Sequence, residues 1–259
     1  MKILTFSYDD GVTQDIRLID LFNKYGMKAT FNLNSELLGK DGQLLREGVV
    51  VSHKKNNPQD IKSIYAGHEV AVHTLTHPNL RTIAQDEEVI RQVEKDRLNL
   101  SELCGYEVTG MAYPCGGNCY DERVIHLIEN HTGVKYARTT NSTFEFKKQT
   151  KLLEFHPTVY HHMEMDKMFE LGERFLSLKN TEEIQLFYVW GHAYEFDIRD
   201  EWGRFESFLE MMSRRDDICY CTNRELLCIR KFYIDPERDV TVVLGVNCSN
   251  ALYNLRQPS

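Results

Sequence analysis

The sequence predicts an α/β fold, a closed or nearly closed barrel of seven or eight parallel strands with helices packed around it. Short runs rich in β-branched and aromatic residues alternate along the chain with runs of helical spacing, an order typical of a parallel sheet covered by helices. The 259 residues are a usual length for one such barrel. Polar residues able to do chemistry repeatedly lie where the predicted strands end.

In the first half of the chain, apolar side chains at helical spacing predict helices across residues 16–26 and 86–105, each of which ends at a glycine. Residues 39–60 are largely polar and contain Pro58, which predicts a loop. Four strands are predicted in this half, at residues 3–8, 29–33, 69–73 and 108–113.

The same alternation continues to about residue 230. One face of residues 121–130 is apolar, which predicts a helix. Beyond residue 230 the pattern changes, with a single strand-like run at residues 240–244. We therefore expect one barrel domain over residues 1–230 and a C-terminal extension over residues 231–259 that packs on the same domain. Three further barrel strands are predicted at residues 134–139, 185–190 and 218–221.

The charge, the apolar stretches and the cysteine count of the chain argue against several classes of partner and location. The net charge of −8 argues against a nucleic-acid partner, which would require a basic face. The chain reaches Asp9 and Asp10 after one short strand, and it contains neither a secretory leader nor an apolar stretch long enough to span a bilayer. We therefore expect a cytoplasmic protein without a membrane partner. The odd count of seven cysteines suggests reduced thiols, and the oligomeric state stays open.

Polar side chains lie at or just after the ends of several predicted strands. In α/β barrels the active site gathers at the rim formed by the C-terminal ends of the strands. Segments that are far apart in the chain are therefore expected to converge there. The residues at these positions are Asp9, Asp10, His73, His77, Tyr113, Pro114, Arg138 and His192.

Asp9 and Asp10 are adjacent carboxylates followed by Gly11. Neighbouring negative charges repel, and the pKa of one carboxyl rises unless a cation lies nearby. A bound divalent metal would relieve this repulsion, with one carboxylate as a ligand and the other free as a base. The alternative, an ordinary Asp-Gly turn without a metal, is equally compatible with the sequence.

His73 and His77 form an H-x-x-x-H pair. On a helical turn this spacing puts both imidazoles on one side, within reach of one ion. Together with one aspartate they would leave positions on a metal open for water and substrate, as a catalytic site requires. The alternative is two unrelated histidines, one buried and one exposed.

His192 follows an apolar strand and is either a buried structural residue or a general acid. Glu195 and Asp197 are candidates to orient it, since a carboxylate partner would raise its pKa. His161 and His162 are expected in a solvated loop, with a place in a substrate cleft as the alternative.

Taken together, these residues resemble the motifs of the polysaccharide deacetylase family of metal-dependent carbohydrate esterases, over about residues 1–230. The motif H-[S/T]-x-x-H-P is matched throughout by residues 73–78. The motif T-F-D-D-G is similar to residues 5–11, slightly expanded, and R-x-P-[F/Y]-G corresponds to residues 112–116. The last motif, a hydrophobic strand ending in histidine, corresponds to residues 189–192.

The resemblance implies a distorted (β/α) barrel and a divalent metal, zinc first, with cobalt, nickel or manganese also compatible with the ligands. Residues expected to contact the substrate are Tyr113, Pro114 and Tyr194. The family's metal ligands correspond to Asp10, His73 and His77, its general base to Asp9, its general acid to His192, and its oxyanion-binding backbone N–H to that of Cys115.

Two positions depart from the family pattern. The arginine of the third motif, which steadies the catalytic aspartate, is Ala112 here. We hypothesise that Arg138 on the next strand takes its place; the alternative is a purely structural arginine. Cys115 replaces an aromatic residue, which changes the pocket wall but keeps the backbone N–H.

The expected function is metal-dependent hydrolysis of an N-acetyl (or O-acetyl) group on an amino sugar or oligosaccharide. The expected partner is thus a small carbohydrate or amide substrate. Two alternatives stay open: a hydrolase of a non-sugar, ureide-type amide that uses the same metal site, and a non-catalytic carbohydrate-binding protein.

Overall fold

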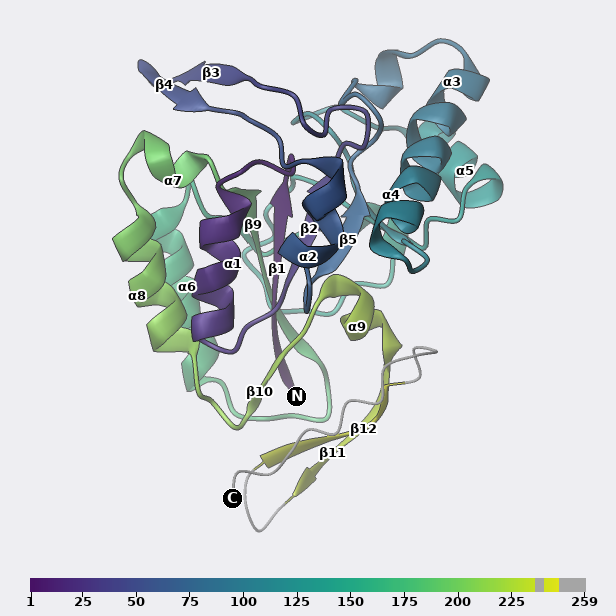
Figure 1. Ribbon diagram of the computed structural model, residues 1–259. Helices are drawn as coiled ribbons and strands as arrows, with labels where there is room; N and C mark the ends of the chain where they lie inside the picture. The colour runs from purple at the N-terminus through teal and green to yellow at the C-terminus, as the bar shows by residue number, and fades with distance from the viewer. Residues whose placement is uncertain (236–239, 247–259) are drawn as a thin grey trace.

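The computed structural model describes the backbone of residues 1–235 and 240–246 and the side chains of residues 1–229. A parallel sheet curls into a half-barrel in the order β7-β6-β5-β2-β1-β9-β8, with β10 paired to β1 (Figure 1). This confirms the predicted α/β barrel class. The strands are β1 (Lys2–Asp9), β2 (Ala29–Leu33), β5 (Glu69–Val72), β6 (Gly110–Ala112), β7 (Tyr136–Arg138), β8 (Val159–Tyr160), β9 (Gln185–His192) and β10 (Ile218–Tyr220).

Helices flank the sheet on both sides. Figure 1 shows α1, α6 and α8 grouped beside β1 and β9, with α3, α4 and α5 on the other side near β5. The helices are α1 (Asp15–Lys24), α2 (Ile61–Ile64), α3 (Asp86–Ile90), α4 (Asp96–Cys104), α5 (Glu122–His131), α6 (Met165–Ser177), α7 (Glu195–Ile198), α8 (Trp202–Met212) and α9 (Asn223–Cys228). A π-helical turn (Arg91–Lys95) joins α3 to α4, and single 3₁₀ turns cover Pro58–Asp60, Leu80–Thr82 and Leu152–Glu154.

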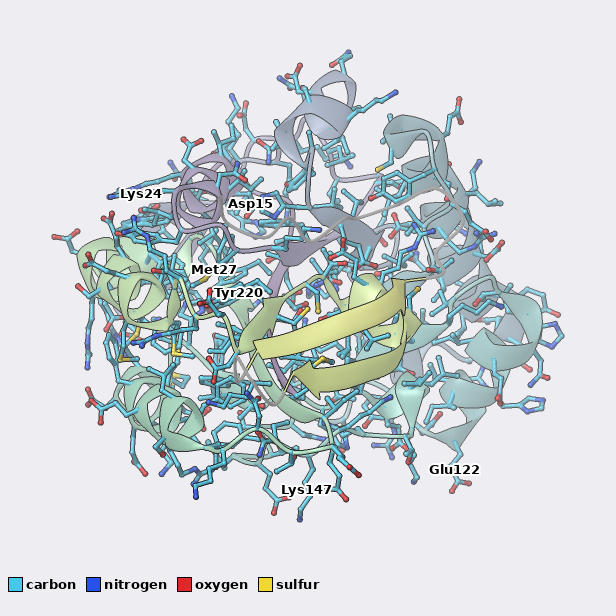
Figure 2. All side chains as sticks on the ribbon, turned by 90° about the horizontal axis from the view of Figure 1, so that it is seen from below. Asp15, Lys24, Met27, Glu122, Lys147 and Tyr220 are labelled. Atoms are coloured by element: carbon cyan, nitrogen blue, oxygen red, sulfur yellow. The ribbon has the colours of Figure 1, made fainter. Side chains whose placement is uncertain are left out.

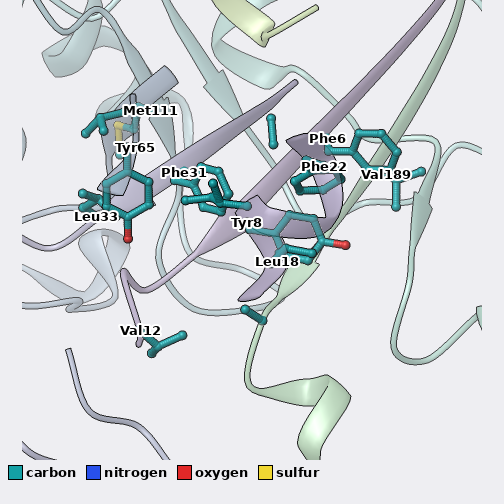
Figure 3. Close-up of a cluster of buried hydrophobic side chains, with 14 of the residues drawn as sticks. Phe6, Tyr8, Val12, Leu18, Phe22, Phe31, Leu33, Tyr65, Met111 and Val189 are labelled. Atoms are coloured by element: carbon teal, nitrogen blue, oxygen red, sulfur yellow. The ribbon is translucent and has the colours of Figure 1, made fainter. Parts of the chain in front are cut away.

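Strand β1 lies at the centre of the core, and all eight of its residues are buried. Parallel strands covered on both faces are expected to be buried throughout in this way. Phe6 and Tyr8 point from β1 into an aromatic cluster with Phe22 and Phe31 (Figure 3). The Phe6 and Phe22 ring centroids are 4.8 Å apart. This packing fixes the position of β1, and the two adjacent aspartates at its C-terminal end therefore have a fixed place at the rim.

The prediction of a loop across residues 39–60 is wrong in part. Strands β3 (Gln43–Arg46) and β4 (Val49–Ser52) form an antiparallel hairpin beyond the C-terminal end of β1 (Figure 1). Glu47 and Gly48 both have positive φ, at 50° and 79°, as the two central residues of a tight hairpin turn require. The Glu-Gly pair between two short apolar runs was therefore a hairpin signal.

The C-terminal strand pattern is confirmed, because β12 (Val240–Val246) pairs antiparallel with β11 (Ile229–Asp235). Seen from below, this ribbon lies across the end of the sheet opposite the rim that carries Asp9 (Figure 2). The domain boundary at residue 230 stays a prediction, and residues 236–239 and 247–259 of the predicted extension lie outside the described part.

Two further expectations concern cysteines and membranes. The expectation of reduced thiols is wrong for Cys228, which is disulfide-bonded, and stays a prediction for the five described cysteines that make no disulfide. Within the residues that the structure describes, no helix has both the length and the apolar character needed to cross a bilayer.

Candidate active site

A strained turn at the end of β1 separates the two adjacent carboxylates. Asp10 has φ 84° and Gly11 has φ 63°, a region that residues with a Cβ seldom adopt. A Cβ at Gly11 would lie 2.9 Å from Leu33 Cδ2, so the turn needs glycine there. The two aspartates consequently contact different partners.

Asp10, His73 and His77 converge at the rim. Their ligand atoms all lie within 4.8 Å of one another, with His77 Nε2 3.9 Å from Asp10 Oδ1. The expected helical turn is wrong, because Thr74 and His77 both have positive φ and no helix covers them. Instead the Thr74 hydroxyl accepts a hydrogen bond from the His77 N–H, and this tight loop brings the two rings together.

The protonation of the two histidines suits a metal. His73 Nδ1 donates to the Ala112 carbonyl at 2.9 Å, which leaves Nε2 unprotonated, buried and without a hydrogen-bond partner. Burial lowers the pKa of His73 to about 4 and also lowers the pKa of His77. Neutral imidazoles with the far nitrogen tied to a carbonyl are typical metal ligands. The two nitrogens and one carboxylate therefore fit a zinc-type divalent ion.

Asp9 is held outside this triad. Asn32 Nδ2 donates to its Oδ1 at 2.7 Å, and the guanidinium of Arg138 donates to its Oδ2. Arg138 is fully buried and lies over the Trp190 ring, 4.3 Å from its centroid. The contact that the Arg138 hypothesis required is thus present, although its role in catalysis stays a prediction.

His192 lies beside Asp9 because β1 and β9 pair in register, Asp9 opposite His192. Its Nε2 is 3.9 Å from Asp9 Oδ2, and its Nδ1 is 2.9 Å from Glu195 Oε1. Burial alone would lower the pKa of His192, but the Glu195 carboxylate, together with the charges of Asp10 and Asp9, outweighs burial and raises it to about 9. Of the two predicted orienting carboxylates, Glu195 makes the contact, whereas Asp197 accepts from the Trp202 indole.

Sequence reasoning missed two residues that follow the β3–β4 hairpin and contact Asp10. His53 Nε2 lies 3.1 Å from Asp10 Oδ2, and buried Lys55 donates to the Asp10 carbonyl at 2.6 Å. Burial would raise the pKa of Asp10, but the His53 hydrogen bond and the Lys55 charge hold it well below its usual range. Asp10 is therefore an ionised carboxylate even before a metal binds.

The residues predicted to contact substrate have different surroundings. The Tyr194 ring centroid lies 5.1 Å from that of His192 and 5.2 Å from that of His53, the histidine that contacts Asp10. The Tyr113 ring is buried against Tyr120 and its hydroxyl donates to the Leu153 carbonyl, so its contacts give no support to a substrate role.

The other third-motif positions lie close by. Pro114 is buried. Cys115 has φ 66°, and its Sγ is 3.8 Å from Nδ1 of His77, a member of the triad. The oxyanion and substrate roles of these two residues stay predictions.

Comparisons with known proteins give a family match and several similar folds. The model of a family described as polysaccharide deacetylase matches residues 1–137, more than half of the chain. A family 4 carbohydrate esterase from Streptomyces lividans, solved in complex with acetate, is 12% identical with a TM-score of 0.53, covering 93% of this chain and 97% of that chain. A CE4-family pseudoenzyme from Bacillus anthracis is 16% identical with a TM-score of 0.52, covering 88% and 66%. At these identities the structural similarity shows the fold alone, and the family match shows that the chain belongs to the polysaccharide deacetylase family.

Proposed function

We propose that this protein is a metal-dependent deacetylase that hydrolyses the N-acetyl group of an amino sugar or oligosaccharide. The observation that carries the proposal is the separation of the two carboxylates. Asp10 converges with His73 and His77, whereas Asp9 lies 3.8 Å from His73 Nε2 and stays bound to Arg138. One carboxylate is thus placed to ligate and the other to accept a proton.

Asp10, His73 and His77 would hold the metal, which supplies an activated water and polarises the acetyl carbonyl. Asp9 is placed to take the proton from the attacking water, and Arg138 and Asn32 keep its carboxylate oriented. The backbone N–H of Cys115 would hold the carbonyl oxygen as negative charge develops on it.

His192 completes the arrangement on the other side of Asp9. An amine leaves readily only if its nitrogen receives a proton, so a protonated group must face the scissile bond. The pKa of about 9 keeps His192 protonated at neutral pH, and Glu195 fixes its Nδ1–H so that Nε2 faces the site. This supports His192 as the general acid.

Acetate release from zinc-loaded protein with acetylated amino-sugar oligomers tests the proposal. Asp9→Asn should lower kcat by about 10²–10⁴-fold and leave zinc binding unchanged. Asp20→Asn, at an exposed aspartate on α1, is the matched control and should keep full activity. Near-normal turnover in Asp9→Asn would refute the base assignment.

The same assay separates the alternatives. Activity on linear or cyclic ureides without acetate release from sugars would move the substrate class to non-sugar amides. Sugar binding without turnover of any acetylated substrate, in protein with bound zinc, would place the chain with the family's pseudoenzymes.

A further inference from the structure

A second group of metal-ligating side chains lies behind His192. His161 and His162 follow β8, and Glu195 begins α7. Their ligand atoms all lie within 4.8 Å of one another, and the three residues are only 0%, 5% and 4% exposed. The expectation that both histidines belong to a solvated loop is therefore wrong.

The His161 ring is locked in one orientation. It stacks on Phe196 with centroids 4.3 Å apart, and its Nδ1 edge packs so closely on Gly191 that a Cβ there would overlap it. Its Nε2 consequently faces Glu195 Oε2 at 3.5 Å. Two ligands of one tetrahedral zinc ion lie roughly 3.4 Å apart, given zinc–ligand distances of about 2.1 Å. Neither nitrogen of His161 has a hydrogen-bond partner.

His162 offers a second nitrogen with a defined tautomer. Its Nε2 lies 3.1 Å from Glu47 Oε1, and Glu47 is held by two hydrogen bonds from Arg199. The carboxylate fixes the proton on Nε2, so the lone pair is on Nδ1, which is buried and without a hydrogen-bond partner. A carboxylate behind a histidine is a common arrangement around protein-bound metals.

We propose that His161, His162 and Glu195 form a second site for a divalent transition metal, separate from the Asp10–His73–His77 site. A bound ion would pair the inward nitrogens of both histidines, which otherwise cost free energy as buried unsatisfied groups. His162 also lines a surface cavity of about 410 Å³, together with Glu164 and Arg199. The inference does not depend on the proposed activity.

Metal stoichiometry tests the proposal. Equilibrium dialysis against cobalt(II) or zinc should give two equivalents per chain for the natural protein and one for His162→Gln. His77→Gln should lose the equivalent bound at the Asp10–His73–His77 site and retain the one at the second site. The double variant His77→Gln/His162→Gln should bind no metal. His126→Gln, at an exposed histidine on α5, is the matched control and should bind two equivalents.

A variant outside the buried cluster keeps the test independent of folding defects. Glu47→Gln, at the surface, should weaken the second equivalent about 10–100-fold and leave the first unchanged. Binding of one metal equivalent by the natural protein, or of two by His162→Gln, would overturn the second site. The buried nitrogens of His161 and His162 would then be hydrogen-bonded to water. If the Asp10–His73–His77 site does not bind metal, His77→Gln will bind the same number of metal equivalents as the natural protein, a result distinct from failure of the second site.

Discussion

At the residue scale, two neighbouring aspartates acquire different chemistry because the backbone reverses between them. Asp10 is hydrogen-bonded to His53 and Lys55, whereas Asp9 accepts hydrogen bonds from Asn32 and Arg138. Each buried carboxylate is thus paired with its own cation, which offsets the repulsion expected for adjacent negative charges. Arg138 is therefore the charge partner of Asp9.

Removal of that cation tests the pairing. Arg138→Met should lower the free energy of unfolding by about 3–5 kcal/mol, because Asp9 would be a buried charge without a partner. Urea unfolding of the metal-free protein measures the loss. The double variant Asp9→Asn/Arg138→Met should recover part of it, since the unpaired charge is gone. A loss under about 1 kcal/mol in Arg138→Met would show that Asp9 is not paired as described.

Asp15, which is not one of the proposed metal ligands, gives a pH dependence of stability. Burial raises its pKa to about 8, although the Tyr65 hydroxyl donates to Oδ2 at 2.7 Å. In the unfolded chain the pKa is about 3.9. The folded protein therefore binds the extra proton, and the contribution to stability is lost as pH rises from about 4 through 8.

Asp15→Asn removes this titration and keeps a side chain that accepts from Tyr65. The variant should gain stability relative to the natural protein between pH 5 and pH 8.5, measured as the difference in free energy of unfolding at each pH. A constant difference across this range would show that Asp15 is ionised in the fold.

At the element scale, the β3–β4 hairpin and the segment that follows it complete the site. Lys55 bridges to Val12 through the backbone, and its ammonium holds the carbonyl of Asp10 in a positive-φ conformation. His53 contacts Asp10 Oδ2, whereas Oδ1 faces His77 at 3.9 Å and the Lys55 ammonium at 3.5 Å. The hairpin thereby sets which carboxylate oxygen a metal meets.

Lys55→Met should therefore weaken zinc binding about 10–100-fold, as loss of a residue that orients a ligand does. Competition with a chromogenic chelator measures the affinity. Lys54→Met is the matched control, because Lys54 is exposed and next in the chain. Tighter zinc binding in Lys55→Met would instead mean that the ammonium acts through charge repulsion, which contradicts a positioning role.

At the scale of the whole molecule, the parallel sheet explains why so much of the site was predictable. Parallel strands end at one rim, so Asp9, His73, Arg138 and His192, which lie at or just after the ends of four predicted strands, were expected near each other. The register between β1 and β9 then fixes the Asp9–His192 pair. These contacts follow from strand order and need no knowledge of loops.

The other features of the candidate site could not be predicted, because they depend on tertiary packing that sequence patterns do not encode. The hairpin places His53 and Lys55 over the rim only through its tertiary contacts. Strand β8 has just two residues, too few for a periodic signal, so the burial of His161 could not be read from the sequence. Tyr113 likewise turns toward Tyr120, a partner chosen by the fold.

The most direct test is anomalous diffraction at the zinc edge from crystals soaked in zinc. The account predicts a peak about 2.0–2.2 Å from Asp10, His73 Nε2 and His77, with the Asp9 carboxylate still bound to Arg138. No peak at this rim, or a zinc ion ligated by Asp9 in place of Asp10, would contradict the division of roles between the two aspartates.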